Sequence, residues 1–216
     1  MLSPSLVIFD CDGVLVDSEL LSHSVLREMI AEFGVDLTLE ETLEHFMGTS
    51  TEKCLEVLNS LVGQSAPADF FHQFRTRTFA AFARDLTSVQ GAPELLAALH
   101  VPYCVASNGP REKMRFTLGH TGLLPLVEGR LFSAQDVARP KPAPDLFLNA
   151  AASLGAQASS CVVIEDSPTG VAAARAAGMV VYGFAAMGQS KKLFQAGAQL
   201  VFGSMSELPA LLGSAQ

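Results

Sequence analysis

The stretch that decides the predicted fold is Leu-Val-Ile-Phe-Asp-Cys-Asp-Gly-Val-Leu, residues 6–15. Its apolar first half has the composition of a buried β-strand and ends in Asp10 and Asp12, with Gly13 allowing the chain to turn away. In open α/β sheets, ligands bind just beyond the carboxyl ends of the strands. Two carboxylates this close repel each other, so we expect a cation between them. The alternative is a polar turn in which Asp12 caps a helix.

The composition limits the class of protein. The chain has 216 residues, enough for one large domain or for one and a half small ones, and it is 49% hydrophobic and 17% charged. Its formal net charge of -8 and its pI near 5.0 argue against nucleic acid or an anionic membrane as a partner. We therefore expect any phosphate site to be made locally, by a cation, a lysine or backbone N–H groups.

Targeting signals and cysteine usage predict a cytoplasmic protein. No apolar run approaches the ~20 residues that a membrane span needs. The N-terminus has no basic region followed by an apolar segment, so we expect no signal peptide. No pair of cysteines has the spacing of metal ligands, and we expect reduced thiols at Cys11, Cys54, Cys104 and Cys161.

Residues 17–86 are predicted to be entirely helical. Apolar residues recur at helical spacing in four segments, at about 17–33, 38–46, 51–62 and 69–84. The second segment opens with Thr38 and Glu41 in a capping-box pattern. Because no strand pattern interrupts these segments, we expect a helical unit inserted directly after the first strand.

From Gly91 onward the pattern alternates between helix and strand. Strand-like runs lie at about 102–107, 129–132, 161–164, 179–182 and 199–202. This repetition predicts a parallel sheet covered by helices on both faces. We therefore expect an α/β fold with a Rossmann-like, doubly wound core of residues 1–16 and 87–216, and an inserted all-helical domain of residues 17–86.

Polar side chains gather at the predicted strand ends, which share one edge of a parallel sheet. They are Asp10, Asp12, Ser107, Asn108, Glu165 and Asp166, with Lys141 in a loop stiffened by prolines. Four acids, a hydroxyl, an amide and one lysine suit a magnesium-assisted phosphoryl transfer. Hard oxygen ligands bind Mg²⁺, and the cation neutralises phosphate oxygens.

Chemical roles can be assigned within this set, although simpler structural roles stay open. A carboxylate can attack phosphorus and form an aspartyl phosphate, and a second carboxyl can protonate the leaving alcohol and later activate water. Ser107 and Lys141 would hold the phosphoryl oxygens. Alternatively, Ser107-Asn108 and Glu165-Asp166 each cap a helix, and Lys141 is a surface lysine. The prolines that flank Lys141 fix its position, which favours a functional role.

The constellation resembles the haloacid dehalogenase-like phosphatase superfamily, over essentially the whole chain. Four motifs match in the family order: Asp10-Cys11-Asp12-Gly13-Val14, Ser107-Asn108, Lys141-Pro142 and Glu165-Asp166-Ser167-Pro168-Thr169-Gly170. The resemblance implies Asp10 as nucleophile and Mg²⁺ ligand, and Asp12 as general acid/base and as a ligand through its backbone carbonyl. It also implies Asp166 as a ligand and Glu165 as a ligand or as support for the ligands. The implied phosphate-binding residues are Ser107, Asn108 and Lys141.

The helical unit adds a second resemblance. It is similar to the small helical cap of the subgroup that contains β-phosphoglucomutases and sugar-phosphate phosphatases. The segment from Cys104 to Pro110, with Lys113-Met114 and Leu118-Gly119, looks like the branch of bacterial 6-phosphogluconate phosphatases. Candidate substrate contacts in the cap are Thr49, Ser50 and Arg75, although arginine on a helix is more often simply solvated.

We therefore expect a Mg²⁺-dependent phosphatase acting on a small sugar or sugar-acid phosphate, with 6-phosphogluconate as one candidate. A β-phosphoglucomutase is the first alternative, but such mutases carry a histidine and an arginine at the positions of Ser22 and Thr51. A catalytically idle member that binds a metabolite or partner is the second, and no motif is broken to support it. The expected binding partner is a small phosphorylated metabolite, and we expect no nucleic acid or membrane partner. The expected oligomeric state is a monomer or weak dimer.

Overall fold

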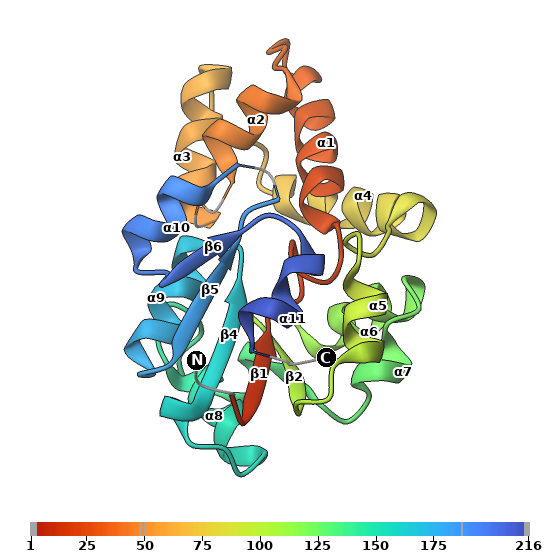
Figure 1. Ribbon diagram of the computed structural model, residues 1–216. Helices are drawn as coiled ribbons and strands as arrows, with labels where there is room; N and C mark the ends of the chain where they lie inside the picture. Colours follow the sequence, from red (N-terminus) through yellow and green to blue (C-terminus); the bar gives the residue numbers. More distant parts are fainter. Residues whose placement is uncertain (1–3, 48, 50, 187, 214–216) are drawn as a thin grey trace. The chain divides into compact units, whose positions relative to one another are not determined.

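The computed structural model describes residues 4–47, 49, 51–186 and 188–213. Contacts within the chain divide it into two compact units, which Figure 1 shows in the colours of the sequence. The first, called the sheet unit, comprises Met1–Val16 and Thr87–Gln216. The second, called the helical unit, comprises Asp17–Leu86.

The described part of the sheet unit contains a sheet of six parallel strands in the order β3-β2-β1-β4-β5-β6. The strands are β1 (Leu6–Phe9), β2 (Tyr103–Ser107), β3 (Leu131–Ser133), β4 (Cys161–Glu165), β5 (Val180–Phe184) and β6 (Leu200–Phe202). From β1 the order runs outward through β2 and β3, and from β4 it runs the opposite way. The direction therefore reverses between β1 and β4, which is where open α/β sheets bind ligands.

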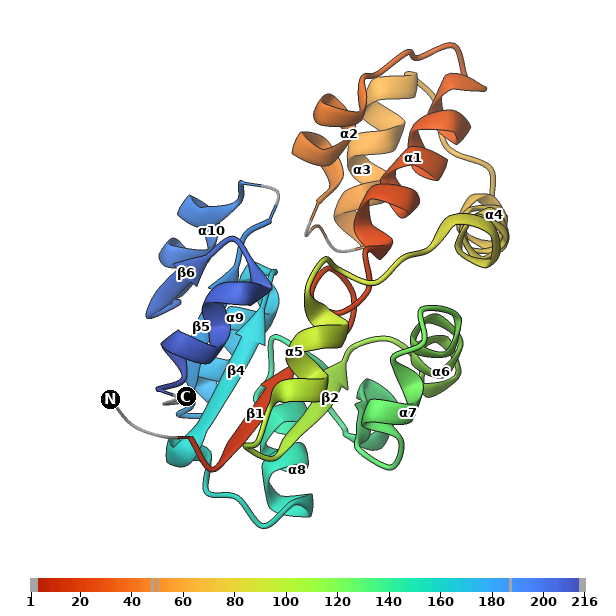
Figure 2. The ribbon, with the colours of Figure 1, turned by 45° about the vertical axis from the view of Figure 1, so that its right-hand side comes forward.

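Helices cover both faces of this sheet. On one face α9 (Pro168–Ala176) packs between α8 (Asp145–Ser153) and α10 (Ser190–Ala196). The remaining helices of the unit are α5 (Ala92–Ala98), α6 (Arg111–His120), α7 (Leu124–Val127) and α11 (Leu208–Leu211). Figure 2 shows α5 in front of the strands and α8 behind them. The strands are thus buried from both sides, which explains their continuous apolar runs.

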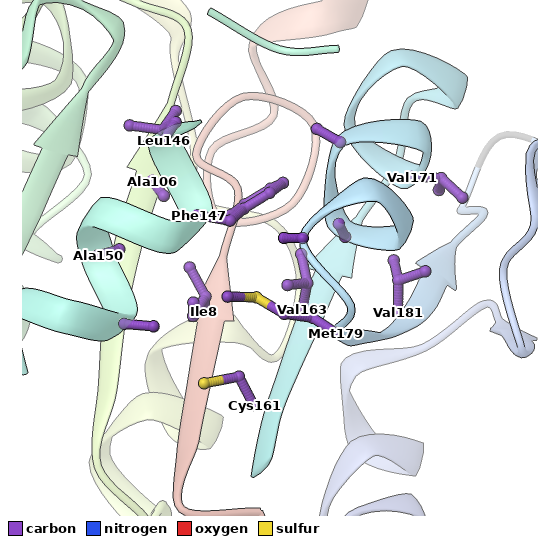
Figure 3. Packing of buried hydrophobic residues seen from close by; sticks show 14 of the residues in the cluster. Ile8, Ala106, Leu146, Phe147, Ala150, Cys161, Val163, Val171, Met179 and Val181 are labelled. Carbon is purple, nitrogen blue, oxygen red and sulfur yellow. The ribbon is translucent and has the colours of Figure 1, made fainter. Parts of the chain in front are cut away.

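One layer of the hydrophobic core lies between the sheet and α8, α9 and α10. Figure 3 shows Ile8 of β1 and Val163 of β4 near Phe147 of α8, with Val171 of α9 farther toward β5. All four side chains are fully shielded from solvent. Burial of such side chains contributes roughly 1.5–3 kcal/mol each to the free energy of unfolding. This core holds the carboxyl ends of β1 and β4 rigidly beside each other.

The helical unit contains α1 (Ser18–Ala31), α2 (Leu39–Phe46), α3 (Thr51–Val62) and α4 (Phe70–Asp85). The predicted capping box opens α2: the Glu41 N–H donates to Thr38 Oγ1 at 3.1 Å, and the Thr38 N–H donates to Glu41 Oε2 at 2.8 Å. The unit has its own apolar cluster, which includes Ile30, Phe46, Leu58 and Phe70. It therefore buries hydrophobic surface independently of the sheet.

The predicted α/β fold, with a parallel sheet and a helical insertion after the first strand, is confirmed. Some elements differ from the sequence prediction. The third strand, expected at 129–132, is Leu131–Ser133, and α7 was not expected. Short 3₁₀ turns at Ala134–Asp136, Ala158–Ser160 and Met205–Glu207 complete the described elements. Among the helices described, none is long and apolar enough to cross a membrane.

Candidate active site

The site is built where β1 and β4 end side by side. Phe9 pairs with Ile164 in the sheet register, and the Asp10 N–H donates to the Ile164 carbonyl at 2.9 Å. Asp10 therefore leaves β1 opposite Glu165, the last residue of β4. Both side chains are buried, with 8% of Asp10 and 1% of Glu165 exposed. Two carboxylates in this setting need positive charge close by.

The loop after Asp10 is a tight turn that fixes Asp12. Gly13 has a φ of 74°, a conformation that favours glycine, and its N–H donates to the Val16 carbonyl at 2.9 Å. Val14 and Leu15 are fully buried, and the Leu15 carbonyl accepts from the N–H of Val89 at 2.9 Å. The turn is thus anchored by both hydrogen bonds and apolar contacts, so that Asp12 stays beside Asp10.

Lys141 supplies the positive charge between the two buried acids. Its Nζ donates to Asp10 Oδ1 at 2.6 Å, to Glu165 Oε1 at 2.6 Å and to the Ala106 carbonyl at 2.8 Å. Only 6% of Lys141 is exposed, and its Nζ lies 4.6 Å from the ring centre of Phe147. The ammonium group has three N–H bonds, and these three acceptors account for all of them. Lys141 is therefore not the surface lysine of the simpler alternative.

Burial and charge together shift the ionisation of this cluster. Burial raises the pKa of Asp10 to about 7, the Lys141 ammonium opposes this rise, and the negative charges of Glu165 and Asp12 add to it. Burial alone would lower the pKa of Lys141, but Asp10 and Glu165 outweigh it and raise that pKa well above its ordinary value. Lys141 is thus held in its charged form. The positive charge near Asp10 is not enough to offset the effect of burial on its pKa.

Glu165 has both oxygens engaged. Oε1 accepts from Lys141, and Oε2 accepts from the N–H of Ser167 at 3.1 Å and from its hydroxyl at 2.9 Å. A Cβ atom on Gly170 would lie 1.8 Å from Glu165 Oε1, so the absence of a side chain there makes room for the carboxylate. This geometry favours Glu165 as the partner of Lys141 over a direct metal ligand.

Ser167, rather than Glu165 or Asp166, caps α9. Its hydroxyl accepts from the Gly170 N–H at 3.0 Å and donates to Glu165 Oε2 at 2.9 Å. The sequence analysis did not single out Ser167, although a serine directly before Pro168 at a helix start is a recognisable capping signal.

Asn108 serves the backbone of the Lys141 loop. Its amide nitrogen donates to the Lys141 carbonyl at 3.1 Å, and its amide oxygen accepts from the Lys141 N–H at 3.0 Å. Ser107 is 3% exposed, and its hydroxyl oxygen accepts from the Gly109 N–H at 3.0 Å. Neither side chain caps α6, whose first flanking residue is Pro110.

A second lysine, which the sequence analysis did not assign to the site, contacts Asp12. The Lys113 Nζ donates to Asp12 Oδ2 at 2.8 Å. Lys113 stands in the first turn of α6, and side chains in a helix lean toward its N-terminus. The helix begins at the same sheet edge as Asp12, so this lean carries the ammonium group toward the acids.

The remaining candidates lie in different places. Asp166 follows β4 at the same sheet edge and is half-buried. Thr49 and Arg75 belong to the helical unit, where both are exposed, and the Thr49 hydroxyl donates to the Phe46 carbonyl at 2.7 Å. Ser50 lies outside the described residues.

The charges at the sheet edge suit a divalent cation, although no group of three or more acids, histidines or cysteines among the described residues is already arranged as a metal site. The four carboxylates are Asp10, Asp12, Glu165 and Asp166, and the two ammonium groups beside them are Lys113 and Lys141. Of the two Asp10 oxygens, the described hydrogen bonds engage only Oδ1. Oδ2 is therefore available to bind a cation or to attack a phosphorus atom.

Comparison with known proteins gives the family. The model of haloacid dehalogenase-like hydrolases matches residues 4–178. A 6-phosphogluconate phosphatase from Escherichia coli is 34% identical, over 95% of this chain and 93% of its own length. A phosphorylated carbohydrates phosphatase from Thermotoga maritima is 28% identical, over 89% of this chain and 91% of its own length.

Two solved structures agree with this result. A haloacid dehalogenase-like protein from Agrobacterium tumefaciens has a TM-score of 0.91 and 34% identity, covering 97% of this chain and 98% of its own. A family hydrolase from Deinococcus radiodurans, solved with bound phosphate and sodium, has a TM-score of 0.88 and 36% identity, covering 99% of this chain and 96% of its own. The chain therefore belongs to the haloacid dehalogenase-like hydrolases and is a phosphatase of that family.

Proposed function

We propose that this phosphatase hydrolyses the monoester of a small sugar or sugar acid, through an aspartyl phosphate formed on Asp10. The relatives support this substrate class, because two of them are named for 6-phosphogluconate and for phosphorylated carbohydrates. A third, from Escherichia coli, is named for fructose 1-phosphate and is 30% identical over 80% of this chain and 92% of its own length. 6-Phosphogluconate is the first substrate to test.

The observation that carries the proposal is the asymmetric environment of the Asp10 carboxylate. Lys141 fixes Oδ1 at 2.6 Å, while no described hydrogen bond engages Oδ2. A nucleophile needs one oxygen held in place and the other oxygen available for attack. Asp10 meets both conditions at the reversal point of the sheet, where this fold binds its ligands.

The reaction then uses the residues beside Asp10. Oδ2 forms a bond to phosphorus as the bond to the ester oxygen breaks, and Asp12 gives its proton to the departing oxygen. Water next attacks the aspartyl phosphate, gives a proton to Asp12, and releases phosphate. Lys141 keeps its positive charge beside the phosphoryl group throughout, and the Ser107 hydroxyl is the candidate donor to a phosphoryl oxygen.

Mg²⁺ would be held by the carboxylates of Asp10 and Asp166 and by the backbone carbonyl of Asp12. When bound, it neutralises phosphoryl oxygens and offsets the repulsion among the carboxylates. The gathering of acidic side chains at this edge of the sheet supports a divalent ion. Glu165 contributes indirectly, because its carboxylate orients Lys141.

The helical unit, residues 17–86, is proposed to act as a cap that selects the substrate. Thr49, Ser50 and Arg75 stay candidates for contact with its non-phosphate end. The mutase alternative finds little support in α1, because the Ser22 hydroxyl donates to the Ser18 carbonyl at 2.8 Å within its own helix. The Ser22 hydroxyl is thus engaged within its own helix, at the position where those mutases carry a histidine.

The test measures phosphate release from p-nitrophenyl phosphate and from a panel of sugar phosphates, with and without Mg²⁺. Asp10→Asn should lower kcat by about 10⁴-fold or more, because the nucleophile is lost. The matched control is Asp36→Asn, which removes an exposed acid of the helical unit and should leave kcat unchanged. If Asp10→Asn keeps its rate, Asp10 is not the nucleophile; if wild type releases no phosphate from any ester, the proposed activity is wrong.

A further inference from the structure

We propose that Lys113 is a positioning residue that orients the Asp12 carboxyl group for proton transfer. This inference rests on the proposed function. Its first support is the ion pair between Lys113 Nζ and Asp12 Oδ2, at 2.8 Å. The Lys113 side chain is 26% exposed and that of Asp12 is 18% exposed. A pair this sheltered from water is held in place more firmly than an ion pair on the open surface.

The backbone around the Lys113–Asp12 pair is well ordered by local contacts. The Thr117 hydroxyl donates to the Lys113 carbonyl at 3.1 Å, and Thr117 is itself fully buried. A Cβ atom on Gly109 would lie 3.6 Å from Lys113 Cδ and 3.8 Å from Asp12 Oδ2. The bare backbone of Gly109 thus borders both members of the pair. The helix thus carries the ammonium group to Asp12, and the pair lies against the backbone of Gly109.

Both steps of the reaction depend on where Asp12 points. In the first, the bond between phosphorus and the ester oxygen breaks and that oxygen takes the proton of Asp12. In the second, water forms the new bond to phosphorus, the bond to Asp10 breaks, and the proton of water passes to Asp12. A carboxyl group that rotates freely would spend less time in line for either transfer. The contact with Lys113 at Oδ2 restricts that rotation.

Leaving groups of different basicity isolate this role. An alkoxide leaving a sugar phosphate needs a proton, whereas p-nitrophenolate leaves without one. General acid catalysis contributes about 10²- to 10⁴-fold, so Lys113→Met should lower kcat/KM for the best sugar phosphate by about tenfold to a hundredfold. It should change kcat/KM for p-nitrophenyl phosphate by less than about threefold. This parameter reports only the steps up to formation of the aspartyl phosphate, and p-nitrophenolate needs no proton in that step.

A double-mutant cycle with Asp12→Asn completes the test. If Lys113 acts through Asp12, adding Lys113→Met to Asp12→Asn should lower kcat/KM for the sugar phosphate by less than about twofold further. Lys113→Arg, which keeps a cation, should recover part of the lost rate for sugar phosphates. The matched control is Arg115→Met in the same helix, where Arg115 pairs with Glu128 at the surface, and it should leave both rates unchanged.

Three results would overturn the inference. Equal losses for both substrates would indicate a structural role. A raised KM that persists in the Asp12→Asn background would indicate direct substrate binding by Lys113. Unchanged sugar-phosphate kinetics in Lys113→Met would remove any role. Each of these leaves the Asp10 chemistry intact, so the inference can fail while the proposed function stands.

Discussion

The two units of the molecule handle charge in opposite ways. In the sheet unit, Lys141 pairs with Asp10 and Glu165, and the three side chains are 4%, 11% and 1% exposed. In the helical unit, Arg77 pairs with Glu32, and these side chains are 41% and 55% exposed. An exposed pair contributes about 0–1 kcal/mol to the free energy of unfolding, because water solvates each partner nearly as well alone. A buried pair is different, since removal of one partner strands the other in a poorly solvated place.

The largest expected effect comes from Lys141→Met, which breaks the buried cluster. It leaves Asp10 and Glu165 facing each other without a cation, so the free energy of unfolding should fall by about 3–5 kcal/mol. Phosphatase activity should fall by about 10³-fold, because Asp10 loses the contact that fixes Oδ1. Urea denaturation and initial rates with p-nitrophenyl phosphate measure the two effects.

Arg77→Met is the matched control, because it breaks an ion pair of the helical unit. It should leave the free energy of unfolding nearly unchanged, because water solvates both exposed partners. If the two substitutions cost the same, the contrast between buried and exposed pairs is wrong for this protein.

A smaller effect is expected from Gly170→Ala. The new Cβ would lie 1.8 Å from Glu165 Oε1, so the carboxylate must move away from Lys141. Overpacking of this kind costs about 1–3 kcal/mol, and the initial rate with p-nitrophenyl phosphate should fall as well. Gly119→Ala in α6 is the control, since the new Cβ finds its nearest neighbour, Leu124 Cδ2, at 3.7 Å. That control should be neutral or stabilising by up to about 1 kcal/mol, because alanine favours the helix. Thermal unfolding of both variants would show whether the clash at Gly170 is relieved by other movements.

The smallest effect concerns Mg²⁺ and pH. Burial raises the pKa of Asp10 to about 7, so below this pH a proton competes with the cation for the carboxylate. Between pH 8 and pH 6 the ionised fraction falls about tenfold, which weakens Mg²⁺ binding by about 1.4 kcal/mol. The rise in melting temperature caused by Mg²⁺ should therefore be about 3–6 °C larger at pH 8 than at pH 6. In Asp10→Asn the difference between the two pH values should disappear; if it persists, another group controls the pH dependence.

Much of the fold follows from local pattern. The apolar run before Asp10 and the run from Cys161 to Ile164 predict buried strands, and both are observed. The helix α6, Arg111–His120, fits the predicted alternation of helix and strand, and Pro110 and Gly122 delimit it. α7 was missed because it has only four residues, too few for a helical period to be visible.

The sequence also predicts that acids gather at one edge of the sheet, but it does not predict which charged groups pair with each other. Glu165 was equally compatible with a metal site, and only the tertiary contact with Lys141 shows where its carboxylate points. Lys113 was missed for the same reason, because its contact with Asp12 depends on how α6 docks on the sheet. The identity and spacing of residues predict which side chains lie at a sheet edge. Which of these side chains form ion pairs depends on the direction of each side chain, and that direction is set by tertiary packing.

The charge cluster also spans the chain in the order of its synthesis. Asp10 and Lys141 are 131 positions apart, and Lys141 and Glu165 a further 24. A growing polypeptide therefore carries an acid destined for the interior through most of translation before its cation emerges from the ribosome. Until β4 pairs with β1, the Asp10 carboxylate can stay hydrated without a desolvation penalty. The buried cluster is complete only after the final third of the chain, which contains Glu165, has been synthesised. The buried charge cluster can therefore form only after synthesis has passed β4 and the sheet has assembled.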